Sequence, residues 1–275
     1  MEFPVYHEQP IDDKLHIKSL YTASRRSFAS DYKYTGESHD FYEIVCVTSG
    51  KAGVTADNKI FMLSAGQMIV HTPNEFHNLW SDGEVAEIII VSFGADCFPE
   101  QLRGVYNLSP DELFRLEELY QETVQTLLLN GIDVAGVKEG MEAAASILLK
   151  KLEIFLLTLA ANTRTNEAGY RTRSAENYIR ISGAMEKMLD RFPTAKDLAE
   201  ACNLSVPALE KTVRRFAGHG AMKHFRTMKM KRADELLTQG LNVKETAYAL
   251  GFSDPNYFSA VFKKYTGYSP THWKK

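Results

Sequence analysis

Hydrophobic and polar residues follow two different patterns along this chain. Up to about Ala95, short runs rich in β-branched and aromatic residues are separated by turn residues, which is typical of strands. The clearest runs cover residues 42–47, 68–70 and 86–93. Many short strands at this spacing predict a jelly-roll or barrel in the N-terminal part.

From Ser109 onward the apolar residues recur every three or four positions, which predicts helices. Ser109 is a suitable N-cap for a helix over residues 110–128, and a second helix is predicted over residues 137–161. The second helix is apolar on more than one side, so it needs more than one partner. We expect one face to pack on the barrel and another to pack on the same helix of a second protomer, forming a homodimer. The alternative is a helix buried wholly within one chain.

The C-terminal part contains one helical pattern twice. In each copy, a helix with a small Ala is followed by a residue that tolerates the left-handed conformation and then by a helix-capping residue. These residues are Ala199, Asn203 and Ser205 in the first copy, and Ala247, Gly251 and Ser253 or Asp254 in the second. Two such units, joined by a predicted helix over residues 222–237, indicate tandem helix-turn-helix motifs.

The second copy resembles the AraC/XylS family of bacterial transcription regulators. Residues 247–273, AYALGFSDPNYFSAVFKKYTGYSPTHW, follow the signature of that family closely, and the resemblance extends back to about Leu198. The first copy departs from the family pattern, with Val213 in place of Phe and Lys229 in place of Arg. The resemblance implies a DNA-binding regulator, with double-stranded DNA and RNA polymerase as partners and activation as the expected effect.

The distribution of charge agrees with this interpretation. From Arg180 onward the chain has 17 of its 32 Lys and Arg but only 9 of its 35 Asp and Glu, a net charge of +8 against −11 for the rest. A basic unit attached to an acidic one fits the binding of DNA phosphates. We therefore predict an effector-binding and dimerisation domain over residues 1–165, a polar linker over 166–177 and a DNA-binding domain over 178–275.

Apolar stretches and cysteines indicate the expected cellular compartment. The most apolar stretch, residues 147–161, is too short for a membrane span and contains Lys150, Lys151 and Glu153. We find no pattern of a signal peptide, and the three cysteines are scattered without a CxxC pair. We expect a cytoplasmic protein without a membrane partner, with reduced thiols and no cofactor.

Two sets of exposed residues are predicted to contact DNA. Asn256 is the best candidate for an adenine contact, whereas Lys211 and Arg214 suit guanine or phosphate and Glu210 suits cytosine. Arg215, Lys263 and Lys264 are predicted to hold phosphates. The complete set is Pro207, Ala208, Glu210, Lys211, Arg214 and Arg215 in the first copy, and Pro255, Asn256, Ser259, Lys263 and Lys264 in the second. The two helices are expected to enter major-groove segments roughly 34 Å apart.

In the N-terminal part, Glu37-x-His39-x3-Glu43-x6-Gly50 and Pro73-x-Glu75-x-His77 resemble the two motifs of the cupin superfamily. Many AraC-type regulators have such a barrel, which implies a cupin-like jelly-roll that binds a small effector, with sugars as an example class. The chain as a whole is thus expected to be of the α+β class, with this barrel and its helical dimerisation segment followed by an all-α domain with two helix-turn-helix motifs.

Three interpretations of the polar set remain open. His39, Glu43, His77 and Trp80, joined by Arg25 and Arg26 as an anion clamp, form an effector pocket with an aromatic wall. Alternatively, Glu37, His39, Glu43 and His77 bind a metal ion, although the cupin pattern has His in place of Glu37. In the third interpretation, His39 and Glu43 only satisfy one another. The corresponding alternatives for function are a metal-dependent cupin enzyme fused to a DNA-binding domain, and a regulator whose barrel only dimerises; we predict a regulator and no enzyme.

Overall fold

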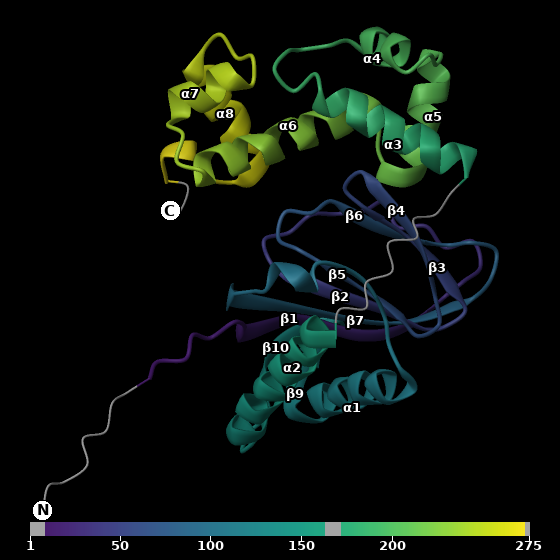
Figure 1. The fold of residues 1–275 in the computed structure, drawn as a ribbon, viewed down its shortest axis with the longest axis vertical. Coiled ribbons are helices and arrows are strands. Elements are labelled where there is room, and N and C mark those ends of the chain that lie inside the picture. The colour runs from purple at the N-terminus through teal and green to yellow at the C-terminus, as the bar shows by residue number, and fades with distance from the viewer. Residues whose placement is uncertain (1–8, 163–171, 273–275) are drawn as a thin grey trace, which may run out of the picture.

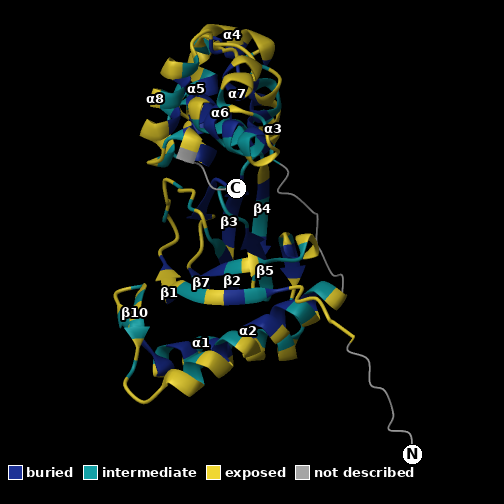
Figure 2. Ribbon diagram, turned by 90° about the vertical axis from the view of Figure 1, so that its left-hand side faces the viewer, coloured by how far each residue is buried: buried dark blue, intermediate teal, exposed yellow. Residues whose placement is uncertain are grey.

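The computed structural model describes residues 9–162 and 172–272 of the chain. Its elements form successive layers along the longest dimension of the molecule (Figures 1 and 2). Two helices cover one face of a large sheet, a small sheet lies against the other face, and the C-terminal helices pack beyond the small sheet.

The strands of the N-terminal part belong to two antiparallel sheets. Their bounds are β1 (His16–Phe28), β2 (Tyr42–Ser49), β3 (Lys51–Ala56), β4 (Lys59–Ser64), β5 (Gln67–His71), β6 (His77–Ser81), β7 (Ala86–Cys97), β8 (Gly104–Asn107), β9 (Leu127–Asn130) and β10 (Asp133–Val137). The large sheet has the order β8-β5-β2-β7-β1-β10-β9, and the small sheet has the order β4-β3-β6. The prediction of a sheet-rich domain followed by a helical domain is confirmed.

The helices follow the capping signals in the sequence. Their bounds are α1 (Pro110–Thr126), α2 (Glu142–Asn162), α3 (Arg173–Glu186), α4 (Ala195–Ala201), α5 (Val206–Ala217), α6 (Ala221–Thr238), α7 (Val243–Ala249) and α8 (Pro255–Thr266), with short 3₁₀ helices η1 (Glu100–Leu102) and η2 (Pro270–His272). Ser109 caps α1 as predicted, in a reciprocal arrangement with Glu112. Within the described ranges, every helix is too short or too polar to cross a lipid bilayer.

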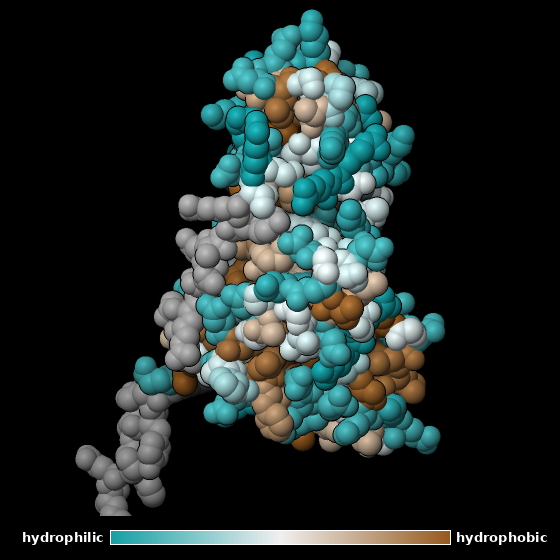
Figure 3. Space-filling model, turned by 90° about the vertical axis from the view of Figure 1, so that its right-hand side faces the viewer, coloured by the Kyte–Doolittle hydropathy of each residue, from teal (hydrophilic) through white to brown (hydrophobic). Residues whose placement is uncertain are grey.

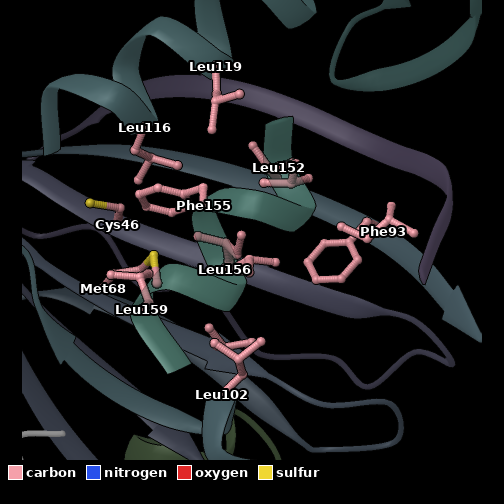
Figure 4. Packing of buried hydrophobic residues seen from close by; sticks show 14 of the residues in the cluster. Cys46, Met68, Phe93, Leu102, Leu116, Leu119, Leu152, Phe155, Leu156 and Leu159 are labelled. Atoms are coloured by element: carbon pink, nitrogen blue, oxygen red, sulfur yellow. The ribbon is translucent and has the colours of Figure 1, made fainter. Parts of the chain in front are cut away.

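The alternation of side chains on β2 divides the barrel domain into two cores. Ile44 and Cys46 pack toward α1 and α2, whereas Val45 and Val47 pack toward the small sheet. In the first of these cores, leucines of both helices and Phe155 of α2 point toward the large sheet (Figure 4). The central strands β2, β5 and β7 are therefore largely apolar on both faces, which explains why they lack a regular polar alternation.

The start of the second predicted helix is wrong. Residues 127–137 form the hairpin of β9 and β10, which joins the edge of β1, and α2 begins only at Glu142. Gly131 and Gly140, with φ of +66° and +77°, occupy the turns before and after β10. L-residues rarely adopt this conformation, so a helix cannot continue through it.

The two predicted helix-turn-helix motifs are formed by α4 with α5 and by α7 with α8, and α6 connects them. Asn203 and Gly251 have φ of +50° and +76° in the two turns. Ser205 caps α5, and Asp254 rather than Ser253 caps α8. The local sequence therefore determines both turns and both caps.

The helical domain packs directly on the small sheet. Phe76 and Trp80 of the barrel domain belong to the same buried cluster as Tyr178 and Phe216 of the helical domain. The Asn78 side chain donates a hydrogen bond to the carbonyl of Phe216 at 2.6 Å. Hydrophobic side chains gather on the lower part of one side of the molecule, whereas the helical domain at the top is mainly hydrophilic there (Figure 3).

Half of the predicted linker, residues 166–177, lies outside the described residues. Helix α3 begins inside it at Arg173, because Thr172 caps the first turn. The stretch that the composition marks as polar therefore includes the first turn of a helix.

Candidate functional site: a polar pocket and two recognition helices

A cavity of about 380 Å³ lies between the two sheets of the barrel domain. Its walls come mainly from β1, β2, β6 and β7, together with the segment before β2. Most of the lining surface is apolar, and carboxylate, imidazole and hydroxyl groups converge at one place, as in small-molecule sites. Of the predicted effector residues, the structure brings His39, Glu43 and His77 together here.

Glu43 is the centre of the polar group. Its carboxylate accepts a hydrogen bond from Ser92 Oγ at 2.9 Å and lies 3.3 Å from His77 Nε2 and 3.8 Å from His39 Nε2. Burial alone would raise the pKa of Glu43, but the two imidazoles outweigh it and hold that pKa far below its ordinary value. Glu43 is therefore a carboxylate at any physiological pH.

The backbone orients both imidazoles. The Nδ1 of His39 donates to the carbonyl of Phe41 at 3.0 Å, and the Nδ1 of His77 donates to the carbonyl of Glu75 at 3.0 Å. Each ring thus presents Nε2 to the cavity, next to Glu43. Burial lowers the pKa of His77, but the hydrogen bond and negative charge of Glu43 more than compensate, so this pKa is raised.

The same residues fit a divalent metal ion in their donor types. One ligand atom each from Glu37, His39, Glu43 and His77 lies within 4.8 Å of the others. Imidazole rings whose Nδ1 binds a backbone carbonyl are held as metal ligands usually are. Glu37 is the weakest member, because its side chain is about half exposed and lies 4.0 Å from His77 Nε2.

Two predicted effector residues lie elsewhere. Arg25 pairs with Glu87 and Glu117 at 3.3 and 3.4 Å, on the face of β1 that is opposite the cavity. Trp80 contacts Phe216 of α5, with ring centroids 5.6 Å apart, and does not line the cavity. Successive residues of a strand point to opposite faces of the sheet, so the side chains of His77 and Trp80 lie on opposite faces of β6. For the same reason Arg26, and not Arg25, lines the cavity.

The aromatic wall of the cavity comes from residues outside the predicted effector set. Phe41 stacks on His39 with ring centroids 3.7 Å apart, and Phe28, Tyr32 and Tyr34 also line the cavity. His71 lies behind His77, stacked at 4.4 Å, and its Nδ1 contacts Glu75 at 3.1 Å. The shared parity of Phe41 with His39 and Glu43 is the signal that points to Phe41.

Most of the predicted DNA-contacting residues lie at equivalent positions of α5 and α8, counted from the caps Ser205 and Asp254. Lys211 and Arg214 are exposed on one face of α5, about one turn apart. Asn256 and Lys263 are exposed on one face of α8, about two turns apart. Pro207, Arg215 and Lys264 are also exposed, whereas Ala208, Pro255 and Ser259 are partly buried. Ser259 Oγ donates to the carbonyl of Pro255 within its own helix, at 2.8 Å.

Glu210 differs from the other members of this set. Its carboxylate accepts a hydrogen bond from the backbone N–H of Ala221 at 3.3 Å, at the first turn of α6, and lies 3.6 Å from Arg214 Nε. A carboxylate is favoured at a helix N-terminus by the exposed N–H groups there. Glu210 thus stabilises the junction of α5 and α6, which competes with the predicted contact to cytosine.

Tandem helix-turn-helix units joined to a barrel with a polar cavity define a DNA-binding transcription regulator with a ligand-binding domain. The model of the AraC-like ligand binding domain matches residues 23–152, and that of the helix-turn-helix domain matches residues 198–275. The chain belongs to the AraC/XylS family. It is therefore a regulator and not an enzyme, which excludes the interpretation as a cupin enzyme.

Two of the similar proteins span most of the chain, and a third spans about a third of it. The HTH-type transcriptional activator RhaS of Salmonella typhi is 24% identical over 240 residues, which cover 84% of each chain. The structure of ToxT from Vibrio cholerae strain SCE256 with bound unsaturated fatty acid covers 94% of this chain and 96% of that one, at 14% identity and a TM-score of 0.37. The C-terminal domain of the response regulator yesN from Fusobacterium nucleatum is 30% identical, covers 34% of this chain and 94% of its own, and has a TM-score of 0.31.

Proposed function

We propose that this protein is a transcriptional activator whose barrel binds a small polar effector, with sugars as the first class to test. The observation that carries the proposal is the convergence of Glu43, His39 and His77 on one cavity of about 380 Å³. The carboxylate and the imidazole Nε2 atoms offer hydrogen bonds to hydroxyl groups, and Phe41 offers an apolar ring face. These are the groups that bind sugars and other polyhydroxylated molecules.

Strand β6 connects the proposed effector site to the DNA-binding domain. His77, Asn78 and Leu79 line the cavity, and the side chains of Asn78 and Trp80 contact Phe216 of α5. An effector that shifts β6 therefore changes the contact with α5. The effector acts as a switch if it binds one arrangement of the two domains better than the other.

A thermal-shift screen of the purified chain against sugars and other polar metabolites tests the effector. A ligand at 100 times its Kd adds about 2.7 kcal/mol to the free energy of unfolding, which is a clear rise in Tm. Glu43→Gln should abolish the rise, and the exposed Glu84→Gln should preserve it. A ligand that stabilises all three proteins equally binds outside the cavity, and a screen without any hit favours a barrel that only dimerises.

A divalent metal ion is a second candidate for the same site, favoured by the two imidazole Nε2 atoms beside Glu43. Elemental analysis of protein purified without chelators distinguishes the two. Stoichiometric zinc, iron, manganese or nickel that is lost in both His39→Ala and His77→Ala identifies a metal-dependent sensor. A metal content near zero, with a sugar hit in the screen, identifies the polar effector.

We propose that α5 and α8 enter adjacent major-groove segments of double-stranded DNA. Support comes from the exposed basic and amide side chains that both helices present on one face. The proposed contacts to bases are made by Lys211, Arg214 and Asn256, and those to phosphates by Arg215, Lys263 and Lys264. Selection of binding sequences from random duplexes by the wild-type chain tests this proposal, which fails if no sequence is enriched with or without an effector.

We also propose a homodimer through α2, with RNA polymerase as the further partner at the promoter. Leu148, Leu152 and Phe155 are buried against the barrel, but Ile147 and Ile154 remain 56% and 62% exposed on another face, two turns apart. Analytical ultracentrifugation should show dimers for the wild type and monomers for Ile154→Glu. A wild type that stays monomeric at high concentration contradicts the dimer.

A further inference from the structure

The two helix-turn-helix units have separate hydrophobic cores. The core of the first unit includes Phe225 of α6, and the core of the second begins at Met230 of the same helix. Leu189, which follows α3, packs against both cores. A connecting helix alone would leave the units free to bend about α6, so a second contact is needed to hold them.

That second contact joins two turns that are far apart in the sequence. The turn after α3 meets the turn between α7 and α8, where the rings of Phe192 and Phe252 lie edge to face at 4.9 Å. Gly251 approaches so closely that a Cβ there would lie 2.1 Å from the carbonyl oxygen of Asp190. The two units thus touch at a joint that accepts only glycine at this position.

Lys229 lies at the centre of this joint. It is 2% exposed, and its Nζ donates to the carbonyl oxygens of Arg191 at 2.6 Å and Leu250 at 2.8 Å. The first carbonyl belongs to the turn after α3, and the second ends α7. The Leu250 carbonyl lies at the C-terminal end of α7, where carbonyl groups lack partners within the helix, and the Arg191 carbonyl lies in a turn. Lys229 thus satisfies one carbonyl from each unit.

The surroundings of Lys229 show that its ammonium group is specifically held. Nζ lies 3.7 Å from the ring centroid of Phe192, and the rings of Phe225 and Phe252 lie farther out, at 5.4 and 5.5 Å. A buried charge is costly unless it is hydrogen-bonded or lies on an aromatic face, and here it has both partners. An aliphatic side chain would fill the same space but would leave both carbonyls buried without a donor.

We propose that Lys229 is a positioning residue that fixes the orientation of α5 relative to α8 and thereby sets the spacing of the two DNA segments that the chain recognises. The turn that it holds on one side leads into α4 and α5, and the turn on the other side leads directly into α8. The inference rests on the proposal that both helices bind adjacent major-groove segments. Because the contact is rigid, each base pair inserted between the segments would misplace one helix along and around the duplex.

The test uses the full chain and the best duplex selected from random sequences. In one set of derived duplexes, one or two base pairs are inserted or deleted between the two recognised segments. In a further duplex, called the single-segment duplex, one of the two segments is scrambled. Lys229→Met keeps the apolar stem but removes the two hydrogen bonds. We expect this variant to bind the intact duplex at least tenfold more weakly than the wild type and to bind the single-segment duplex with an affinity within about twofold of the wild type. Its affinity should also depend less on the spacing between the two segments.

Two further variants distinguish positioning from general stability. Lys229→Arg should restore the preference for one spacing, since a guanidinium can donate to both carbonyls. Lys223→Met removes the same charge from an exposed position of α6, so it should affect all spacings alike. Phe192→Leu removes the ring beside Nζ at a position that is 58% exposed. It should make the affinity depend less on spacing, and it replaces Lys229→Met in the test if that variant does not fold.

The outcomes separate this inference from the proposed function. Failure of the wild type to enrich any sequence overturns the proposed DNA recognition and the inference with it. If the wild type selects a sequence, but Lys229→Met and Phe192→Leu weaken intact and single-segment duplexes equally and keep the preferred spacing, Lys229 is only structural and the inference is wrong.

Discussion

Residues on β6 have opposite roles according to their parity. His77 faces the polar cavity, and Trp80, three positions later, contacts α5 of the helical domain. On α5, Glu210 accepts a hydrogen bond from the first turn of α6, while Lys211, the next residue, is exposed on the face that we propose contacts DNA. At this scale the direction of a side chain decides its function more than its chemical type does.

Asn256 offers the sharpest test of the recognition surface at this scale. Its side chain is exposed near the start of α8, where an amide can make two hydrogen bonds with adenine in the major groove. Asn256→Ala should cost roughly 1–3 kcal/mol of binding free energy and relax the preference at one base position. Fluorescence anisotropy with single-base variants of the selected duplex measures both effects.

Lys264→Ala is the matched control, because a phosphate contact is lost equally on every sequence. It should weaken all duplexes alike and reduce the dependence of affinity on salt. If Asn256→Ala leaves affinity and base preference unchanged, this face of α8 does not contact DNA bases.

At the scale of single elements, the two helix-turn-helix turns solve one geometric problem with different residues. Both turns need positive φ, which Asn203 adopts at +50° and Gly251 at +76°. Asn203 is exposed, whereas Gly251 lies against the carbonyl of Asp190. The second turn is therefore under a packing restriction in addition to the conformational one.

Alanine substitution should separate these two restrictions. Asn203→Ala should lower the free energy of unfolding by roughly 1–2 kcal/mol, the cost of the left-handed conformation for an ordinary residue. Gly251→Ala should lower it by more, because the added Cβ also clashes with backbone 2.1 Å away. Urea denaturation followed by circular dichroism measures both, and equal losses would mean that the turn relaxes away from Asp190.

At the scale of the whole molecule, the main feature is the docking of the helical domain on the small sheet. Tyr178 donates a hydrogen bond to the carbonyl of Asp57 at 3.0 Å, and Lys231 pairs with the Asp57 carboxylate. Trp80 covers Gly53 on the sheet and reaches Phe216 on α5. These contacts join the two domains, so we expect them to unfold as one unit.

Trp80→Ala should uncouple the domains. Removing a buried aromatic side chain costs about 3–5 kcal/mol in a protein core, and here the loss falls on the contact between domains. Differential scanning calorimetry should show one cooperative transition for the wild type and two for the variant. Val85→Ala, at an exposed position, should keep one transition, and a single transition in Trp80→Ala would show that the remaining contacts suffice.

The same contact predicts a dependence of stability on pH. His224 is buried beside Tyr178, with 3.2 Å between Nε2 and the hydroxyl oxygen, and burial lowers its pKa to about 3. The unfolded chain binds a proton there with a pKa of about 6.5, so the free energy of unfolding falls as the pH falls below that value. The loss is at most about 1.4 kcal/mol per pH unit for this residue.

Neighbouring titratable groups modify this dependence of stability on pH. Burial lowers the pKa of the half-buried His219 to about 4, which acts in the same direction. Burial raises the pKa of Asp234 to about 6, so its contribution is present at low pH and is lost as the pH rises toward 6. Thermal denaturation from pH 7 to pH 5 should show a shallower decline for His224→Gln than for the wild type, and equal slopes would contradict the assignment.

The sequence by itself determined the backbone of the two helix-turn-helix motifs. Caps such as Ser205 and Asp254, and turn residues such as Gly251, act on their immediate neighbours, so their effect is visible in a short stretch. The strand pattern was also predictable from the spacing of apolar residues, and the His39, Glu43 and His77 set from its resemblance to the cupin motifs. The hairpin of β9 and β10 was not, because an edge strand depends on its partner β1.

Only the tertiary structure decided which side chains meet across long separations. Trp80 contacts the helical domain instead of the cavity, and Lys229 binds carbonyls from two different units. The physical reason is that local conformation depends on residues a few positions apart, whereas these contacts depend on how finished elements pack. A pattern within one element shows that a face must be covered, and the packing of the whole chain decides which partner covers it.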